Sequence, residues 1–401
     1  MKPVAQSWRS ALVVALLFAT CNTWGVAGLA AQEPASPQAT SAAQLQAAID
    51  KLGSLDYKTR TDASRVVRRT AASQAVPALL NAVAQHADGY VRFRTLVLLT
   101  AFNDPRIKDA VRESLSSPND RLRTVAYNFL ERNPDKSMLP DLLAALDKEQ
   151  AEFVRPALIR ALAAQGDDAR AQAVLVREAG RGEDFFRSAV IEALGDYKAK
   201  YAFDALNGIA RLDGPLLDDA ALALGKIGDS RALATLAGLQ RSAPRPAQPF
   251  VAAGICLLGT NCDAHEGFLV ETLKFSDQNI GFQELLRGAA SGLGALGVGG
   301  RENSARALFD VGIPSRDPTR APVALAVATI ALRNTPLMLS VLKVAPAQSD
   351  AIALLAEGFD MLEEDFEKER FFALVRRTYW ESAEGSANRQ LMQILIGKLD
   401  F

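Results

Sequence analysis

The 401-residue sequence predicts an all-α fold, a solenoid of stacked two-helix repeats of about 31 residues. Three observations support this prediction. A segment in which an arginine lies seven residues before a leucine or valine occurs five times in succession. Each copy is followed by a second stretch with apolar residues every three or four positions, and polar caps and glycine turns separate the stretches. Two such short helices cannot bury their apolar sides alone, so neighbouring repeats must stack.

The five arginines are spaced by 31 or 32 residues. A sixth copy, at 216–229, keeps its terminal Leu224 but has Leu217 in place of the arginine. We interpret the arginines as a structural ladder whose guanidinium groups hydrogen-bond to caps and carbonyls of neighbouring units. The alternative is a track that binds anions. The ladder consists of Arg60, Arg92, Arg123, Arg155 and Arg187.

Polar residues define the ends of the predicted helices. The first helix of a repeat is expected to end at Asn103-Asp104, Gly166-Asp167, Gly195-Asp196 and Gly228-Asp229. A capping side chain is expected four residues before four of the ladder arginines and before Leu217 of the sixth copy, at Asp56, Asp88, Asn119, Glu183 and Asp213. The second helices are represented by 75–83, 107–115, 138–146 and 231–239.

The segment LLDDAALALGKIGDSRALATLAGL, residues 216–239, resembles the short HEAT-like repeats first described in phycobilin lyases. The resemblance covers 55–240 well and 241–345 loosely, and it implies a right-handed α-solenoid. Such repeats are specific for a fold and poor indicators of activity. No bilin-site residue can be carried over from the lyases. Deoxyhypusine hydroxylase, another HEAT-repeat protein, holds di-iron with several His-Glu pairs, and the single pair His265-Glu266 excludes that chemistry here.

Five segments are expected along the chain. A helix at 41–53 follows a Pro/Ala/Gln-rich linker, and the rhythm loosens at the proline-rich loops 242–249 and 314–322. End units of a solenoid need a polar outer face, so the last three helices are expected to cap the stack. The segments are a signal peptide at 1–31, a linker and capping helix at 32–54, regular repeats at 55–240, degenerate repeats at 241–345 and a helical cap at 346–401.

The N-terminus predicts export. Lys2 and Arg9 precede a nine-residue apolar core at 11–19, which is too short to span a bilayer. The small residues Ala30 and Ala31 then offer a cleavage site, so we expect a Sec-type signal peptide and a periplasmic or secreted chain with no transmembrane span. The alternatives are a lipid anchor on Cys21, which Thr20 and Phe18 fit poorly, and a retained helix.

Composition excludes several functional classes. The hydrophobic fraction of 49% argues against disorder, and a formal net charge of −1 does not favour nucleic-acid binding. Residues 51–132 carry fourteen basic and eight acidic side chains, which is either a face for something anionic or ordinary surface variation. Only two histidines are present, so multi-histidine metal centres are excluded, and no cofactor is expected.

Cys256 and Cys262 are predicted to form a disulfide, because an oxidising compartment favours pairing of two cysteines six residues apart. A metal site that also uses His265 and Glu266 is the alternative, but it lacks the separated CxxC pairs of a structural zinc site. Residues 292–297, GLGALG, match the dinucleotide fingerprint formally. Because the preceding stretch is helical in pattern, we interpret them as a glycine-rich helix end.

The sequence thus favours an exported, non-catalytic scaffold that binds a protein partner on its concave side. The alternatives are an accessory lyase or maturation factor that holds a substrate or chromophore in its groove, and a structural spacer. We expect the second helices to form the concave face, with Arg160 and Glu192 on the opposite layer. The polar positions expected there are Asn81, Gln85, Lys108, Arg112, Asp141, Lys148, Gln172, Arg177, Asp204 and Asn207.

Overall fold

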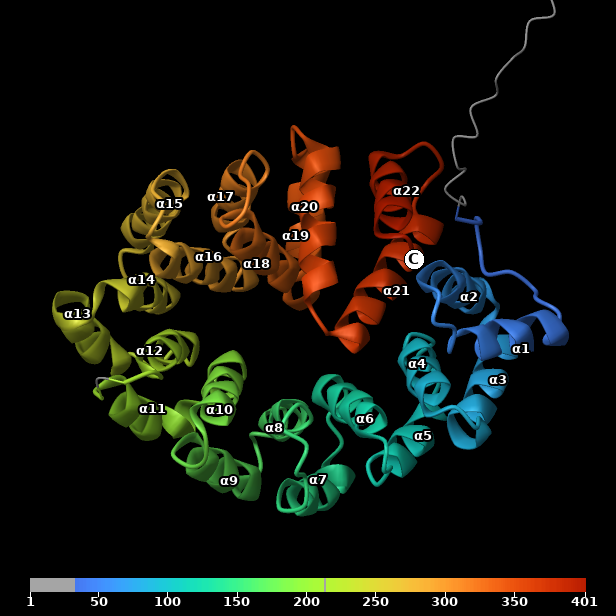
Figure 1. Ribbon diagram of the computed structural model, residues 1–401. Helices are drawn as coiled ribbons and strands as arrows, with labels where there is room; N and C mark the ends of the chain where they lie inside the picture. Colours follow the sequence, from blue (N-terminus) through green and yellow to red (C-terminus); the bar gives the residue numbers. More distant parts are fainter. Residues whose placement is uncertain (1–32, 213) are drawn as a thin grey trace, which may run out of the picture. The chain divides into compact units, whose positions relative to one another are not determined.

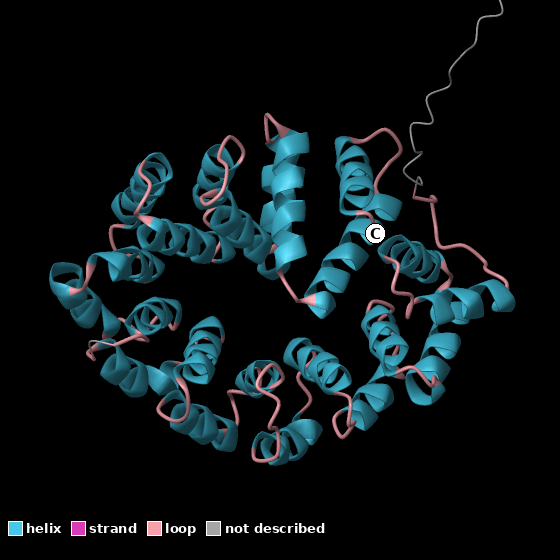
Figure 2. Ribbon diagram, in the orientation of Figure 1, coloured by secondary structure: helices cyan, strands magenta, loops and turns pink. Residues whose placement is uncertain are grey.

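The computed structural model describes residues 33–212 and 214–401. The predicted signal peptide, Cys21 and the cap Asp213 therefore lie outside the described residues. Residues 33–401 form one compact unit of α-helices, confirming the predicted all-α solenoid, and the only β-type contact described is a single bridge between Gln38 and Thr70 (Figures 1 and 2).

The helices alternate between two layers along the curved stack (Figure 1). The inner layer consists of α2 (Tyr57–Arg69), α4 (Gly89–Thr100), α6 (Asp120–Arg132), α8 (Arg155–Ala163), α10 (Asp184–Asp196), α12 (Leu217–Lys226), α14 (Gln248–Leu257), α16 (Gln283–Val298) and α18 (Arg320–Arg333). The outer layer consists of α3 (Ala72–Gln85), α5 (Ile107–Ser114), α7 (Leu139–Leu146), α9 (Ala169–Ala179), α11 (Phe203–Ala210), α13 (Ala232–Ser242), α15 (Cys262–Gln278), α17 (Glu302–Gly312) and α19 (Thr335–Val344). Helix α1 (Ala42–Lys51) precedes them, and α20 (Gln348–Met361), α21 (Asp365–Glu381) and α22 (Ala387–Leu399) follow.

Helix starts largely follow the predicted capping chemistry. The side chains of Asp56, Asp88 and Asn119 each accept a hydrogen bond from a backbone N–H in the first turn of the next helix. Ser41 and Gln44 form a capping box at the start of α1, which confirms the helix expected at 41–53. Glu183 occupies the cap position of α10 without a capping hydrogen bond, so that prediction was wrong in its chemistry.

The apolar interior divides into two cores. One contains residues from Leu45 to Ile255 together with Phe366, and the other contains residues from Ala252 to Phe401. No single helix among residues 33–212 and 214–401 is long and apolar enough to cross a bilayer. Within this described part, only α18 and α19 taken together reach that length, and they are bent by 119° at their junction.

The last helices contact the first ones, because α21 lies against the inner helices α4 and α6 (Figure 1). Glu369 accepts hydrogen bonds from Arg68 of α2 at 2.7–3.1 Å, and both side chains are buried. Arg94 and Arg132 reach Asp365 and Glu367 at 3.0 and 2.7 Å. We call these contacts between α21 and helices α2, α4 and α6 the seam.

The seam corrects one expectation about residues 346–401. These residues were expected to end the stack with a polar outer face, but α21 instead buries charged side chains against the first repeats. The Tyr379 hydroxyl and the Trp380 indole also donate to the backbone carbonyls of Glu33 and Pro34, at 3.2 and 2.9 Å. Repeat periodicity reports only the contacts between neighbouring units, so it cannot show that the two ends of a stack meet.

Candidate functional site

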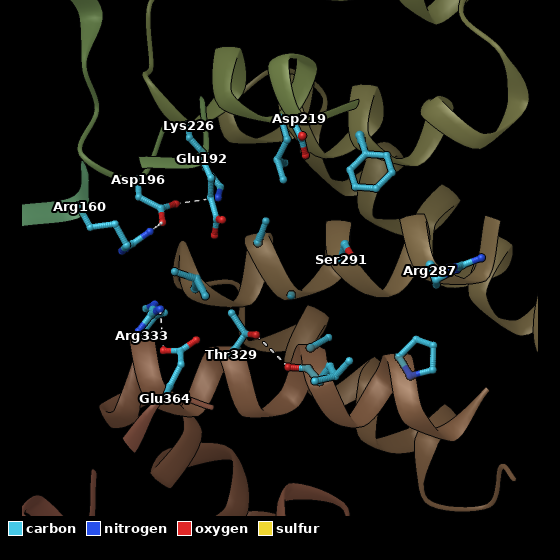
Figure 3. A pocket seen from close by; sticks show the side chains of 18 of the residues that line it. Arg160, Glu192, Asp196, Asp219, Lys226, Arg287, Ser291, Thr329, Arg333 and Glu364 are labelled. Atoms are coloured by element: carbon cyan, nitrogen blue, oxygen red, sulfur yellow. Dashed lines mark hydrogen bonds and ion pairs between the residues drawn. The ribbon is translucent and has the colours of Figure 1, made fainter. Parts of the chain in front are cut away.

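The inner layer encloses a cleft of about 590 Å³ (Figure 3). One wall comes from α10 and α12, and the other comes from α16 and α18. Half-buried apolar side chains, among them Leu222, Phe250 and Leu325, lie beside charged ones on these walls. This combination of apolar surface with a few converging polar groups is typical of binding sites.

A network of ion pairs occupies the part of the cleft next to α8 (Figure 3). Asp196 at the end of α10 accepts from Arg160 at 2.9 Å and from Lys226 at 2.7 Å. Arg160 also donates to Glu131 at 2.9 Å, and the Tyr197 hydroxyl donates to the same oxygen of Glu131 at 2.8 Å. Burial acts to raise the pKa of Asp196, but Lys226 and Arg160 hold it below its usual value. The network therefore consists of neutralised charges that fix the inner helices relative to one another.

A second network connects this region to the seam. Glu367 of α21 accepts from Arg132 at 2.7 Å and from Arg370 at 2.6 Å, and Arg333 pairs with Glu364 at 2.8 Å. Burial opposes the ionisation of Glu367, yet its three arginine neighbours, Arg333 among them, keep its pKa below the usual value. The start of α21 thus bridges α6 and α18.

Two carboxylates on the α10–α12 wall are not neutralised in this way. Among the residues that the structure describes, neither Glu192 nor Asp219 takes part in an ion pair, although Arg160 lies near enough to interact with Glu192 and Lys226 near enough to interact with Asp219. Burial raises the pKa of Asp219 to about 6, and the neighbouring charges of Asp218 and Glu192 add to the rise. A hydrogen bond from Ser188 partly offsets it.

The structure corrects the expected concave face. The second helices form the outer layer of the stack (Figure 1), and the first helices supply most of the residues that line the cleft. Arg160 and Glu192, expected on the opposite layer, both line the cleft. None of the ten predicted partner-binding positions does. Eight of them are exposed and two, Gln172 and Asn207, are half-buried; the ten are Asn81, Gln85, Lys108, Arg112, Asp141, Lys148, Gln172, Arg177, Asp204 and Asn207.

Small residues on the first helices explain this reversal. The layer whose helices approach more closely must lie on the inside of a curved stack. A Cβ atom on Gly225 of α12 would lie 2.4 Å from the Cα of Gly254 in α14, so those helices can meet only through glycine. A Cβ atom on Gly297 of α16 would lie 2.4 Å from the Ile330 side chain of α18. The glycine and alanine content of the first helices was therefore the sequence signal for the concave layer.

Four ladder arginines donate to backbone carbonyls in the segment before their own helix. Arg92 Nε binds Val83 O at 2.7 Å, and Arg123 binds Ser117 O at 2.9 Å and the Glu149 carboxylate at 2.8 Å. Arg60 and Arg187 make equivalent bonds to Ser54 O and Ala179 O. These bonds satisfy carbonyls at or just beyond helix ends.

Arg155 departs from this pattern, because its guanidinium lies over the Phe186 ring, 3.7 Å from the centroid, and its Nε has no hydrogen-bond partner within the described part of the chain. The degenerate repeats fill the ladder position with other donors, which the arginine pattern did not reveal. Gln248 donates to Leu239 O and Ala243 O, Arg320 to Gly312 O and Ile313 O, and Gln348 to Leu342 O.

Cys256 and Cys262 form a disulfide that links the end of α14 to the start of α15, as predicted. Their sulfur atoms are therefore not free to bind a metal, and Glu266 accepts from Arg301 and Ser304. No group of three or more His, Cys, Asp or Glu side chains in the described part of the chain is placed to hold a metal ion. The GLGALG segment lies within α16, where Gly294 packs against Ala326, so it is a helix-packing element as interpreted.

The cleft residues were not predicted as a site from the sequence. Glu192, Asp219 and Phe250 lie on three different inner helices, and a one-dimensional period does not show that α10 and α12 face α16 across the curve. The sequence contains one weaker indication of this site. Asp218 and Asp219 stand in the first turn of α12, directly after Leu217, which takes the place of the ladder arginine.

Comparison with known proteins identifies the repeat. Residues 76–163 match the family described as HEAT repeats. Among solved structures, the chain resembles the complex of CpcE and CpcF of phycocyanin lyase from Nostoc sp. PCC7120, with 20% identity, a TM-score of 0.40 and coverage of 65% of this chain and 97% of that one.

Two further solved structures are importin beta and Kap95p bound to RanGDP, with 13% and 14% identity and TM-scores of 0.36. They match 85% and 88% of this chain, which spans 62% and 57% of theirs. No curated protein sequence matches the chain. The family match lies within the stacked two-helix units that the structure shows. Residues 76–163 therefore consist of HEAT repeats, the kind of repeat that residues 216–239 and their upstream copies resemble.

Proposed function

We propose that the chain is an exported, non-catalytic scaffold that binds a protein partner in the cleft between α10–α12 and α16–α18. The observation that carries the proposal is the cleft itself, where half-buried apolar side chains such as Leu222 and Phe250 share the lining with carboxylates that form no ion pair among the described residues. Protein interfaces combine such an apolar centre with a polar surround. The ion-pair networks at one end hold the inner helices in place without the ligand.

Export is part of the proposal and rests on the sequence of residues 1–31 and on the disulfide at Cys256 and Cys262. Native material should have lost about 3 kDa, roughly thirty residues, relative to the full translation product. An intact-mass measurement checks this. A mass increment of lipid size on Cys21 would contradict it.

Site-specific photo-cross-linking in the native cells tests the binding face. A photoreactive amino acid is placed at Ser291 or Thr329, which are exposed in the cleft, and in matched controls at Asn81 or Gln85 of outer helix α3. We expect cross-links to one protein partner from the cleft positions only. Cross-links from α3 alone would restore the outer layer as the binding face, and no cross-link from the cleft would refute the proposal. A visible chromophore in the purified protein would favour a lyase or maturation factor instead.

A further inference from the structure

The charges that line the cleft differ in how far they are already neutralised. The cations Arg132, Arg160, Lys226 and Arg333 all take part in ion pairs with Glu131, Asp196, Glu364 or Glu367. Glu192 is exposed and Asp219 is half-buried, and neither is paired among the described residues. The α10–α12 wall therefore presents two carboxylates that form no ion pair of their own to whatever enters the cleft, and only the more distant charges of Arg160 and Lys226 attract them.

Folding leaves the Asp219 carboxylate in an unfavourable position. Burial removes water from it, and Asp218 and Glu192 repel its negative charge, while Lys226 is engaged by Asp196 at 2.7 Å. A cationic ligand group would relieve this repulsion and would supply hydrogen-bond donors to both carboxylates. The wall is thus complementary to a positive charge.

Apolar surface lies directly beside these carboxylates. Leu222 is one turn along α12 from Asp219, and Phe250 of α14 and Leu325 of α18 line the same cleft. All three side chains are half-buried. A ligand that places only a charge in the cleft would leave this surface in water, so a matching ligand combines a cation with apolar groups.

Arg287 makes the charge of the cleft differ between its two ends. It is exposed on α16 and forms no ion pair within the described residues, and it lies apart from Glu192 across the view in Figure 3. Its positive charge disfavours a cation at that end. The basic group of a ligand is therefore drawn to the α10–α12 wall.

We propose that the cleft binds an extended protein segment in which a lysine or arginine stands next to apolar residues. The basic side chain faces Glu192 and Asp219, and its apolar neighbours lie on Leu222, Phe250 and Leu325. This inference rests on the proposed scaffold function, since it specifies the chemistry of the partner that the cleft receives.

The experiment selects ligands from a displayed library of random twelve-residue peptides, with the purified disulfide-bonded chain as bait. We expect the enriched peptides to share a lysine or arginine flanked by aliphatic or aromatic residues. Enrichment of acidic peptides, of peptides without a basic residue, or of no sequence at all would overturn the inference. The binding constant of one enriched peptide is then measured by fluorescence anisotropy.

The double variant Glu192→Gln/Asp219→Asn keeps the shape of both side chains and removes both charges. We expect its affinity for the enriched peptide to be at least tenfold lower than that of the wild type. The matched control, Asp141→Asn/Asp204→Asn, removes two exposed carboxylates from outer helices and should change binding less than twofold. Equal effects of the two variants would overturn the inference. If the cleft cross-links to a partner that binds both variants equally, the scaffold function stands and only the present inference fails. If the cleft gives no cross-links, the scaffold function is rejected as well.

Discussion

The repeats before and after the Gly225–Gly254 contact form the same two layers, but different residues stabilise their helix ends and helix contacts. From α4 to α12, three ladder arginines and capping side chains at Asp88 and Asn119 organise the ends of short helices. From α14 to α20, the donors are mostly glutamines, and helices approach through glycine. A Cβ atom on Gly358 of α20 would lie 2.2 Å from the carbonyl oxygen of Ala324 in α18.

The difference shows which parts of a stack are set by its sequence period. Arginine and cap positions repeat because each must reach a carbonyl or an N–H at a fixed offset along its own unit. Close approach of inner helices instead depends on one small residue at each crossing, whose position shifts as the helices lengthen. The two cores that result, around Leu158 and around Leu293, then meet again at the seam.

The largest effect is expected from breaking the seam that joins these regions. Glu369→Gln removes the charge that compensates Arg68 and Arg376, and all three side chains are buried. Burial already lowers the pKa of Arg376 to about 10. Because buried charges are then left unpaired, the free energy of unfolding, measured in urea, should fall by about 3–5 kcal/mol.

Small-angle scattering of the Glu369→Gln variant should also show a larger radius of gyration, because the two ends can then separate. Glu357→Gln is the control, since its pair with Arg320 is partly exposed and should contribute less than about 1 kcal/mol. A seam variant as stable and compact as the control would show that the two regions hold together without these ion pairs.

Glycine substitution tests the packing that distinguishes the C-terminal region. Gly358→Ala forces a methyl group against the backbone of α18, and we expect a loss of about 3 kcal/mol in the free energy of unfolding. A methyl group at Gly238 of outer helix α13 would meet no described atom within 4 Å outside its own helix, so Gly238→Ala should gain about 0.5–1 kcal/mol from the lower entropy of the unfolded chain. Thermal and urea unfolding of both variants provide the measurement. A neutral Gly358→Ala would contradict close packing as the cause of the curvature.

The ladder offers a comparison within the regular region. Arg123→Ala removes three hydrogen bonds and leaves the buried Glu149 carboxylate without its arginine, so a loss of about 1.5–3 kcal/mol is expected. Arg155 makes its main contact with the Phe186 ring, so Arg155→Ala should lose about 1 kcal/mol. The free energies of unfolding of the two variants, measured in urea, test this difference. If Arg123→Ala is as stable as wild type but loses the partner, the arginines are an anion-binding track.

The sequence predicts local features of this fold well. The spacing of Arg92, Arg123 and Arg187, the caps at Asp88 and Asn119, and the Cys256–Cys262 pair all depend on offsets within one unit, and the structure confirms them. Layer assignment failed because amphipathic spacing marks the buried side of a helix without stating which layer faces the centre of curvature.

The seam and the cleft depend on contacts between distant units. Arg68 and Glu369 are separated by 301 positions, and neither lies in a motif that points to the other. Likewise, Asp219 and Phe250 line one cleft with Thr329 only because the intervening repeats turn the chain back on itself. The glycines at 225, 254 and 297 mark the points where inner helices cross closely, and they are the residues of the sequence that indicate the inner layer and its tight curvature.

The smallest expected effect on stability concerns Asp219, which lies on the α10–α12 wall of the cleft. The folded pKa of Asp219 is about 6, above its ordinary value of 3.8, so its carboxyl stabilises the fold only while it is protonated. That contribution is fully present below about pH 4 and is lost as the pH rises through 6. Asp219→Asn should therefore match the wild type near pH 4 and exceed its unfolding free energy by about 1–2 kcal/mol above pH 7, a value discounted for partial exposure. Urea unfolding across this range checks the sign. An Asn variant that is less stable at neutral pH would mean that a cation within the chain compensates Asp219, and the negative wall proposed for ligand binding would then be neutral.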